Sequence, residues 1–218
     1  MYLISRLDEL CRDNNVLEHP FYVRWSAGEL APGELSFYAG EYGHAVHALA
    51  QVSRSAALQA PAPWCADLDS HADEEDAHIG LWQRFAASVG CTGARMPAPL
   101  SARCVTTWTA GRTLLEHLSV LYVIEGTQPQ ISTTKLEGLV EHYGYRSDSP
   151  ATEYFRVHAE RDVEHAHQAR ELIEQLWAQT PRQESEAERM LACAEGALRG
   201  NWRLLDGVEQ PQPATVPT

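Results

Sequence analysis

Histidines and acidic residues at helical spacing are the side chains of this sequence best suited to bind metal ions. The chain has 10 histidines among its 218 residues. His158, Asp162 and His165 occupy positions i, i+4 and i+7, so a helix would place all three on one face. Imidazole and carboxylate groups that converge in this way form a metal site. The segment therefore predicts one half of a metal centre.

Two other segments supply acids that would complete a centre for two metal ions. Glu74 lies four residues before His78, which puts this pair on one face of a second helix. Glu125 ends the apolar run LSVLYVI, where a carboxylate is costly unless it is paired or binds a metal. Glu125 is therefore the candidate for the acid that bridges the two ions, as in other helical carboxylate proteins.

Each of these pairs, taken alone, has an ordinary alternative as an ion pair on a solvated helix surface. The combination of two imidazole and acid sets with a buried acid favours the metal centre. The other histidines are interpreted as surface residues or ordinary core residues, although one of them lies two turns before His78. This group consists of His44, His47, His71, His117, His142 and His167.

The spacing of apolar residues predicts helices and no strands. The expected helices span residues 3–14, 34–59, 65–89, 101–122, 123–144, 151–179 and 183–206. A kink or break is expected directly after Glu125, because Gly126 and Pro129 follow it. The sequence thus predicts an all-α, single-domain bundle of about seven or eight helices over residues 1–207, followed by a disordered tail over 208–218.

The composition limits the partners and the cellular compartment. A net charge of -13 repels phosphate backbones and anionic lipids, so nucleic acids and membrane surfaces are not expected partners. No apolar stretch approaches the roughly 18 residues of a membrane span, and the first residues do not resemble a signal peptide. The five cysteines occur singly, as in reduced proteins. We therefore expect a cytoplasmic protein that acts on small molecules.

The balance of basic residues is unusual. Among 17 basic residues, Lys135 is the only lysine. GC-rich codon usage accounts for an excess of arginine, but it does not explain why one lysine remains. An amine can act as a nucleophile after it loses its proton, whereas a guanidinium stays protonated.

The segments named above, together with others along the chain, resemble the haem-oxygenase-like dimetal oxidases. Within that superfamily the chain is similar to the chlamydial death-domain-associating branch, whose members act as self-sacrificing 4-aminobenzoate synthases. The similarity covers nearly the whole chain, from VLEHPFYVRW through DEEDAHIGLWQRF and VLYVIEGTQPQISTTKLEG to EYFRVHAERDVEHA. The HxxxDxxH order in the last segment is its most specific part.

The resemblance implies both a metal centre and a group of reacting side chains. The implied metal ligands are Glu74, His78, Glu125, His158, Asp162 and His165, which would hold two transition-metal ions, either Fe/Fe or Mn/Fe. Tyr22 would give its ring to the product and Lys135 the amino nitrogen, with Tyr38 and Tyr154 as assisting tyrosines. Dioxygen and a reductant would be co-substrates and no external organic substrate would be needed. A homodimer is compatible with this scheme.

One departure from the branch affects the first ligand. The family segment between the first glutamate and its histidine is longer than DEEDAH, so Glu75 could replace Glu74. The i, i+4 spacing favours Glu74, since Glu75 at i, i+3 would point partly away from His78.

Other functions of the same fold compete with the self-sacrificing synthase. A dimetal oxidase acting on an external fatty acid or amino acid would have the same ligands. A thiamin-salvage hydrolase would need a nucleophilic cysteine, and a cofactorless quinone-forming oxidase would need a basic pocket; HxxxDxxH argues against both. An interaction module would not need six converging ligands.

Overall fold

Helices account for all the regular structure of the described residues, which are 2–93, 95–181 and 183–210 of the computed structural model. The α-helices are α1 (Tyr2–Asp13), α2 (Pro20–Ser26), α3 (Pro32–Ala57), α4 (Cys65–Ser88), α5 (Pro99–Trp108), α6 (Leu114–Glu125), α7 (Gln128–Glu141), α8 (Glu153–Ala178) and α9 (Gln183–Glu209). A short 3-10 helix (Val16–Glu18) precedes α2. The predicted all-α class is confirmed, and nine α-helices lie within the described ranges.

Two local signals explain why there are more helices than expected. The segment predicted as one helix over 101–122 is α5 and α6, because Thr113 and Glu116 form a capping box that starts a new helix. The short α2 was not expected. Its first turn is set by Pro20 and by the His19 side chain, whose Nδ1 accepts from the Phe21 N–H at 3.1 Å.

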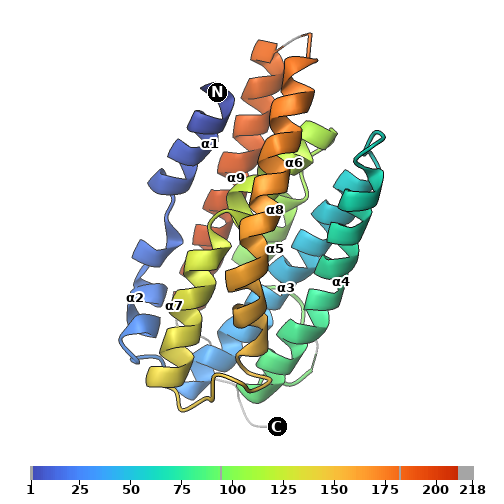
Figure 1. The fold of residues 1–218 in the computed structure, drawn as a ribbon. Helices are drawn as coiled ribbons and strands as arrows, with labels where there is room; N and C mark the ends of the chain where they lie inside the picture. The colour runs from blue at the N-terminus through green and yellow to red at the C-terminus, as the bar shows by residue number, and fades with distance from the viewer. Residues whose placement is uncertain (1, 94, 182, 211–218) are drawn as a thin grey trace.

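The hydrophobic α6 lies inside the bundle (Figure 1) and packs against α3, α8 and α9. Every residue from Leu115 to Glu125 is buried, which is typical of a helix covered on all sides. This arrangement explains the apolar run that ends at Glu125. It also carries the carboxylate of Glu125 to the interior, where none of its surface is exposed.

The expected break after Glu125 is confirmed. Helix α6 ends at Glu125 with Gly126 as its C-cap, and α7 begins at Gln128 with a proline in its first turn. The change of direction lets α7 pack along α8 and α2. Close contact with α2 requires Gly138, because a Cβ there would lie 2.6 Å from Cδ1 of Trp25.

The end of the chain differs from the expected boundary. Val208 and Glu209 belong to α9, so the predicted tail does not begin at residue 208. Val208 is buried against the core, which accounts for the longer helix. Residues 211–218 of the predicted tail lie outside the described residues. Among the described helices, none has the length and hydropathy to cross a membrane.

Candidate metal centre and aromatic site

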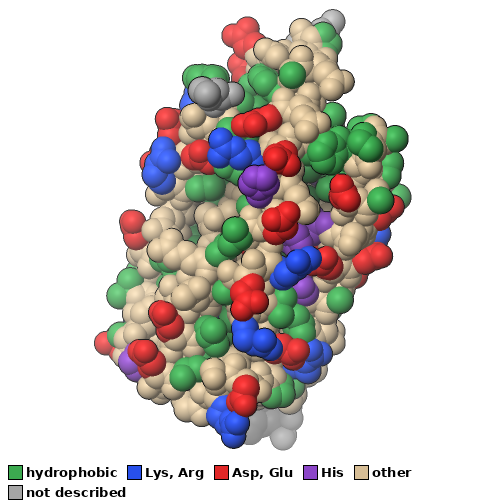
Figure 2. Space-filling view, viewed as in Figure 1, with side chains coloured by type: hydrophobic (Ala, Val, Ile, Leu, Met, Phe, Trp, Pro, Cys, Tyr) green, Lys and Arg blue, Asp and Glu red, His purple; other side chains and the backbone are tan. Residues whose placement is uncertain are grey.

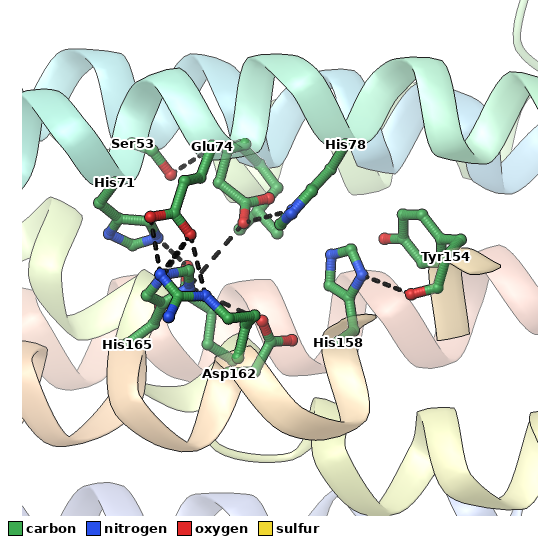
Figure 3. A network of polar contacts seen from close by, with 12 residues as sticks. Ser53, His71, Glu74, His78, Tyr154, His158, Asp162 and His165 are labelled. Atoms are coloured by element: carbon green, nitrogen blue, oxygen red, sulfur yellow. Dashed lines mark hydrogen bonds and ion pairs between the residues drawn. The ribbon is translucent and has the colours of Figure 1, made fainter. Parts of the chain in front are cut away.

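Helices α4 and α8 face each other in opposite directions and carry matching sets of ligands. His71, Glu75 and His78 on α4 repeat the i, i+4, i+7 spacing of His158, Asp162 and His165 on α8. The ring centroids of His71 and His165 are 4.0 Å apart, and those of His78 and His158 are 4.4 Å apart. Figure 3 shows the two sets meeting between the helices.

The carboxylates of this cluster are almost completely buried. Glu125 and Asp162 have no exposed surface, and Glu75 is 1% exposed. His71 Nε2 donates to Glu125 Oε1 at 2.8 Å, and His78 Nδ1 donates to Glu75 Oε1 at 3.0 Å. Ligand atoms fall into two groups, His71, Glu75, Glu125 and His165 on one side and Glu75, His78 and His158 on the other, with Glu75 in both. The arrangement therefore offers two neighbouring metal positions.

Several buried polar atoms of the cluster have no hydrogen-bond partner, as expected for atoms that bind metal. They include Oε2 of Glu125, Nε2 of His158, Nδ1 of His165 and both carboxylate oxygens of Asp162. The Tyr154 carbonyl accepts from His158 Nδ1 at 2.8 Å, which fixes the tautomer and leaves the Nε2 lone pair free. Leaving such groups buried without a partner is costly. The residues therefore fit a metal pair.

Electrostatics at the cluster follow from burial and the close carboxylates. Burial and the charges of Glu125 and Glu75 raise the pKa of Asp162 well above its usual value. Burial alone would raise the pKa of Glu75, but the hydrogen bond from His78 and the nearby imidazoles lower it to about 2. Burial lowers the pKa of His158 to about 4, which keeps it neutral and able to bind a metal.

The buried cluster differs from the predicted ligand set at two positions. Glu74 is 33% exposed and forms an ion pair with Arg161, while the neighbouring Glu75 enters the cluster. The expectation that Glu75 would point away from His78 is wrong, as their hydrogen bond shows. His71, interpreted from the sequence as an ordinary residue, is a buried member of the cluster.

The repeated pattern on α4 could have revealed both residues. The other predicted ligands, His78, Glu125, His158 and His165, lie in the cluster, and Asp162 lies beside them with Oδ1 3.7 Å from His165 Nδ1.

Lys135 lies inside a group of aromatic rings next to the cluster. It is 1% exposed, and its Nζ is 4.5 Å from the ring centroid of Tyr42, 5.1 Å from that of Tyr22 and 5.3 Å from that of Tyr38. Phe155 lies at 5.5 Å. Burial lowers the pKa of Lys135 well below its usual value, which favours the neutral amine.

The predicted tyrosines connect this amine with the metal ligands. The hydroxyls of Tyr22 and Tyr38 are 3.1 Å apart. Tyr154 stacks on the His158 ring at 3.9 Å, and Trp82 lies 4.9 Å from Tyr154 and 5.1 Å from Tyr42. Tyr42 and Trp82 were not predicted; the i, i+4 spacing of Tyr38 and Tyr42 was the available signal.

Replacing Lys135 with Met should stabilise the protein by about 1 to 3 kcal/mol at neutral pH, the order of the cost of burying a polar group. The unfolded chain binds a proton at Lys135 up to its ordinary pKa of 10.5, whereas the folded chain loses that proton at a lower pH. Wild-type stability therefore rises with pH between the folded and the unfolded pKa. The advantage of Lys135→Met should shrink in urea unfolding curves as the pH rises towards 10.5. An advantage that does not change with pH would show that the amine is charged in the folded state.

Comparison with known proteins agrees with this arrangement. Residues 69–199 match the family described as iron-containing redox enzymes, a stretch that includes α6, α8 and most of α4. The chain belongs to this family. The chain is 31% identical to a 4-aminobenzoate synthase of Chlamydia trachomatis over 97% of its own length and 94% of the relative. It is 27% identical to a 4-aminobenzoate synthase of Nitrosomonas europaea, over 94% and 90% of the two chains.

Solved structures establish the fold of this chain. A TenA homologue from Pseudomonas syringae superposes with a TM-score of 0.79 at 18% identity, covering 94% of this chain and 92% of the other. A protein of haem-oxygenase-like fold from Shewanella denitrificans gives 0.72 at 17% identity, covering 95% and 88%. The predicted haem-oxygenase-like fold is therefore confirmed.

Proposed function

We propose that this enzyme is an oxygen-dependent dimetal 4-aminobenzoate synthase that takes the aromatic ring of the product from its own Tyr22 and the nitrogen from Lys135. Two relatives are named 4-aminobenzoate synthase, which supports 4-aminobenzoate as the product. The observation that carries the self-sacrificing part is the placement of the only lysine, with its Nζ 5.1 Å from the ring of Tyr22 and almost no exposed surface.

The proposed centre would be held by residues from three helices. His71, Glu75, Glu125 and His165 would hold one ion, and Glu75, His78 and His158 the other, with Asp162 between the histidines of α8. When bound, an Fe/Fe or Mn/Fe pair supplies the activation of dioxygen, which no side chain performs alone. Tyr154 at the His158 ring, with Trp82 and Tyr42 beyond it, links this centre to the Tyr22 and Tyr38 hydroxyls.

The proposed conversion requires two sets of bond changes. At Tyr22 the Cα–Cβ bond breaks, Cβ is oxidised to the carboxylate carbon of the product, and Cα gains a hydrogen and stays in the backbone as glycine. The Lys135 nitrogen forms a bond to Cζ of the ring, and the phenol oxygen leaves as water. The Nζ–Cε bond is oxidised to an imine and hydrolysed, which releases the nitrogen with the product and leaves an aldehyde at Cε. These two oxidations remove six electrons; two molecules of dioxygen accept them, and a reductant supplies the two further electrons that complete their reduction to water. The protein residues exclude water and hold the amine neutral, and a neutral amine is the nucleophilic form.

Isotope labels test the source of the product. Protein grown with ring-labelled tyrosine and side-chain nitrogen-labelled lysine, then given iron or manganese, a reductant and dioxygen, should yield 4-aminobenzoate carrying both labels. The amount should stay below one product per chain. Because Lys135 is the only lysine, the nitrogen label identifies its source. Peptide mass spectra should locate the ring loss at Tyr22 among the eight tyrosines.

An unlabelled product formed only after an organic compound is added would contradict self-sacrifice. It would instead support a dimetal oxidase that acts on an external substrate.

A further inference from the structure

A small polar pocket lies between α4 and α8 on the surface above the metal ligands. Its volume is about 150 Å³, and every residue that lines it is polar. His71 and His165 form its inner end, whereas Asp67, Glu74 and Arg161 stand closer to the solvent. Figure 2 shows histidine between α8 and α4 on this face, bordered by acidic and basic side chains. The pocket thus runs from the surface to one of the two metal positions.

An ion pair between the two helices lines the outer part of this pocket. Arg161 on α8 binds Glu74 on α4 through Nη2, 2.7 Å from both carboxylate oxygens, and through Nε, 3.1 Å from Oε2. The side chains are 49% and 33% exposed, so either can swing into solvent. Glu74 Oε2 is also 3.4 Å from Nε2 of His165 (Figure 3). The same carboxylate therefore contacts both Arg161 and a candidate metal ligand.

The chemistry of the pocket suits a metal ion better than dioxygen. A hydrated cation needs polar partners along its path, whereas an apolar gas gains nothing from displacing water from polar walls. The pocket is lined by the two carboxylates of Asp67 and Glu74 and by the single guanidinium of Arg161, so negative charge exceeds positive charge, which favours a cation. A volume of about 150 Å³ holds an ion with several water molecules, each of which takes about 30 Å³.

We propose that this pocket is the entrance for metal ions and that the Glu74–Arg161 ion pair is its gate. The inference rests on the proposed metal centre. When Arg161 swings away, the freed Glu74 carboxylate binds the entering ion and passes it to His165 and His71. The position that contains His78 and His158 lies farther from the entrance, so it fills first and the outer position exchanges faster.

Metal loading measures the gate without any product being formed. Metal-free wild-type protein and the metal-free Arg161→Ala variant are each mixed with Mn²⁺, and electron paramagnetic resonance follows the loss of the free-ion signal. Release of bound Mn²⁺ is then followed after a chelator is added. Arg161→Ala should speed loading and the fast phase of release by about two- to fivefold, as expected for loss of one partly exposed ion pair. Glu74→Gln opens the gate but lacks the receiving carboxylate, so it should load more slowly than Arg161→Ala.

Arg84→Ala is the matched control, because Arg84 and Glu153 form another ion pair between α4 and α8, at 2.9 Å. It should load and release at the wild-type rates. If metal loading and release were equally faster in both arginine variants, the helix pair would be generally loosened and the gate proposal would be wrong. The proposal would also be wrong if Arg161→Ala loaded and released metal at the wild-type rates. If wild-type protein took up no metal when given Mn²⁺, iron or a mixture of the two, both the proposed metal centre and the proposed gate would be wrong.

Discussion

The Lys135→Arg variant is expected to make no 4-aminobenzoate while still binding its metal ions. The guanidinium stays protonated and is a poor nucleophile, so the nitrogen donor of the proposed reaction is lost. The candidate metal ligands lie on α4, α6 and α8, whereas Lys135 lies on α7, so the candidate ligands themselves are unchanged. Chromatography of the product and elemental analysis of the same sample measure both effects.

Steric strain is the main competing cause of lost activity, because Lys135 is packed among four rings. Lys135→Met, which has an unbranched neutral side chain, separates the two causes. It should remain folded, bind metal and also make no product. Circular dichroism and thermal unfolding of both variants check the fold.

Moving the lysine gives a second control. Arg199 on α9 is 59% exposed and forms an ion pair with Glu195 of its own helix. Adding Arg199→Lys to Lys135→Arg restores the lysine content but not its position, and product should remain absent. If either Lys135 variant made 4-aminobenzoate at the wild-type yield, the nitrogen would have to come from another donor.

The half of the candidate metal centre on α8 could be predicted because its three residues lie on one helix. The i, i+4, i+7 spacing of His158, Asp162 and His165 needs no knowledge of other helices. Glu125 could be predicted for a different reason, since an acid at the end of a long apolar run is buried in almost any helical fold. Both predictions depend on local sequence alone.

On α4 the sequence interpretation selected Glu74, whereas the buried cluster contains Glu75 and His71, because pairs were considered instead of the whole helix face. The buried face of α4 follows His71, Glu75, His78, Trp82 and Phe85, a repeat of four and three residues. Glu74 is about 100° away from Glu75 around the helix and therefore faces the edge. Extending the apolar stripe from Trp82 and Phe85 backwards would have selected Glu75 and His71.

Contacts between distant segments could not be predicted from spacing. The sequence singles out Lys135 as the only lysine, but its four ring neighbours come from α2, α3 and α8. The pairing of Glu74 with Arg161 joins residues 87 positions apart. Such contacts depend on how the helices pack, which local periodicity does not determine.

Adjacent glutamates on α4 provide the sharpest test of the metal centre. Glu75→Gln should weaken metal binding by about 100-fold or more, since residues that merely support a ligand already contribute about 10- to 100-fold. The change keeps the size of the side chain and an oxygen near His78, but removes the negative charge shared by both metal positions. Loss of both ions is expected, because Glu75 belongs to both groups.

Glu74→Gln is the matched control, one residue away on the same helix. It breaks the ion pair with Arg161 but leaves the two ligand groups intact, so the protein should still hold two ions at equilibrium. Elemental analysis and Mn²⁺ titration calorimetry on both variants, with circular dichroism to check folding, give the comparison. A folded Glu75→Gln protein that kept both ions while Glu74→Gln lost them would return the ligand role to Glu74. Retention of both ions in both variants would mean that neither glutamate holds the metals, and that the buried charges of Glu125 and Asp162 suffice.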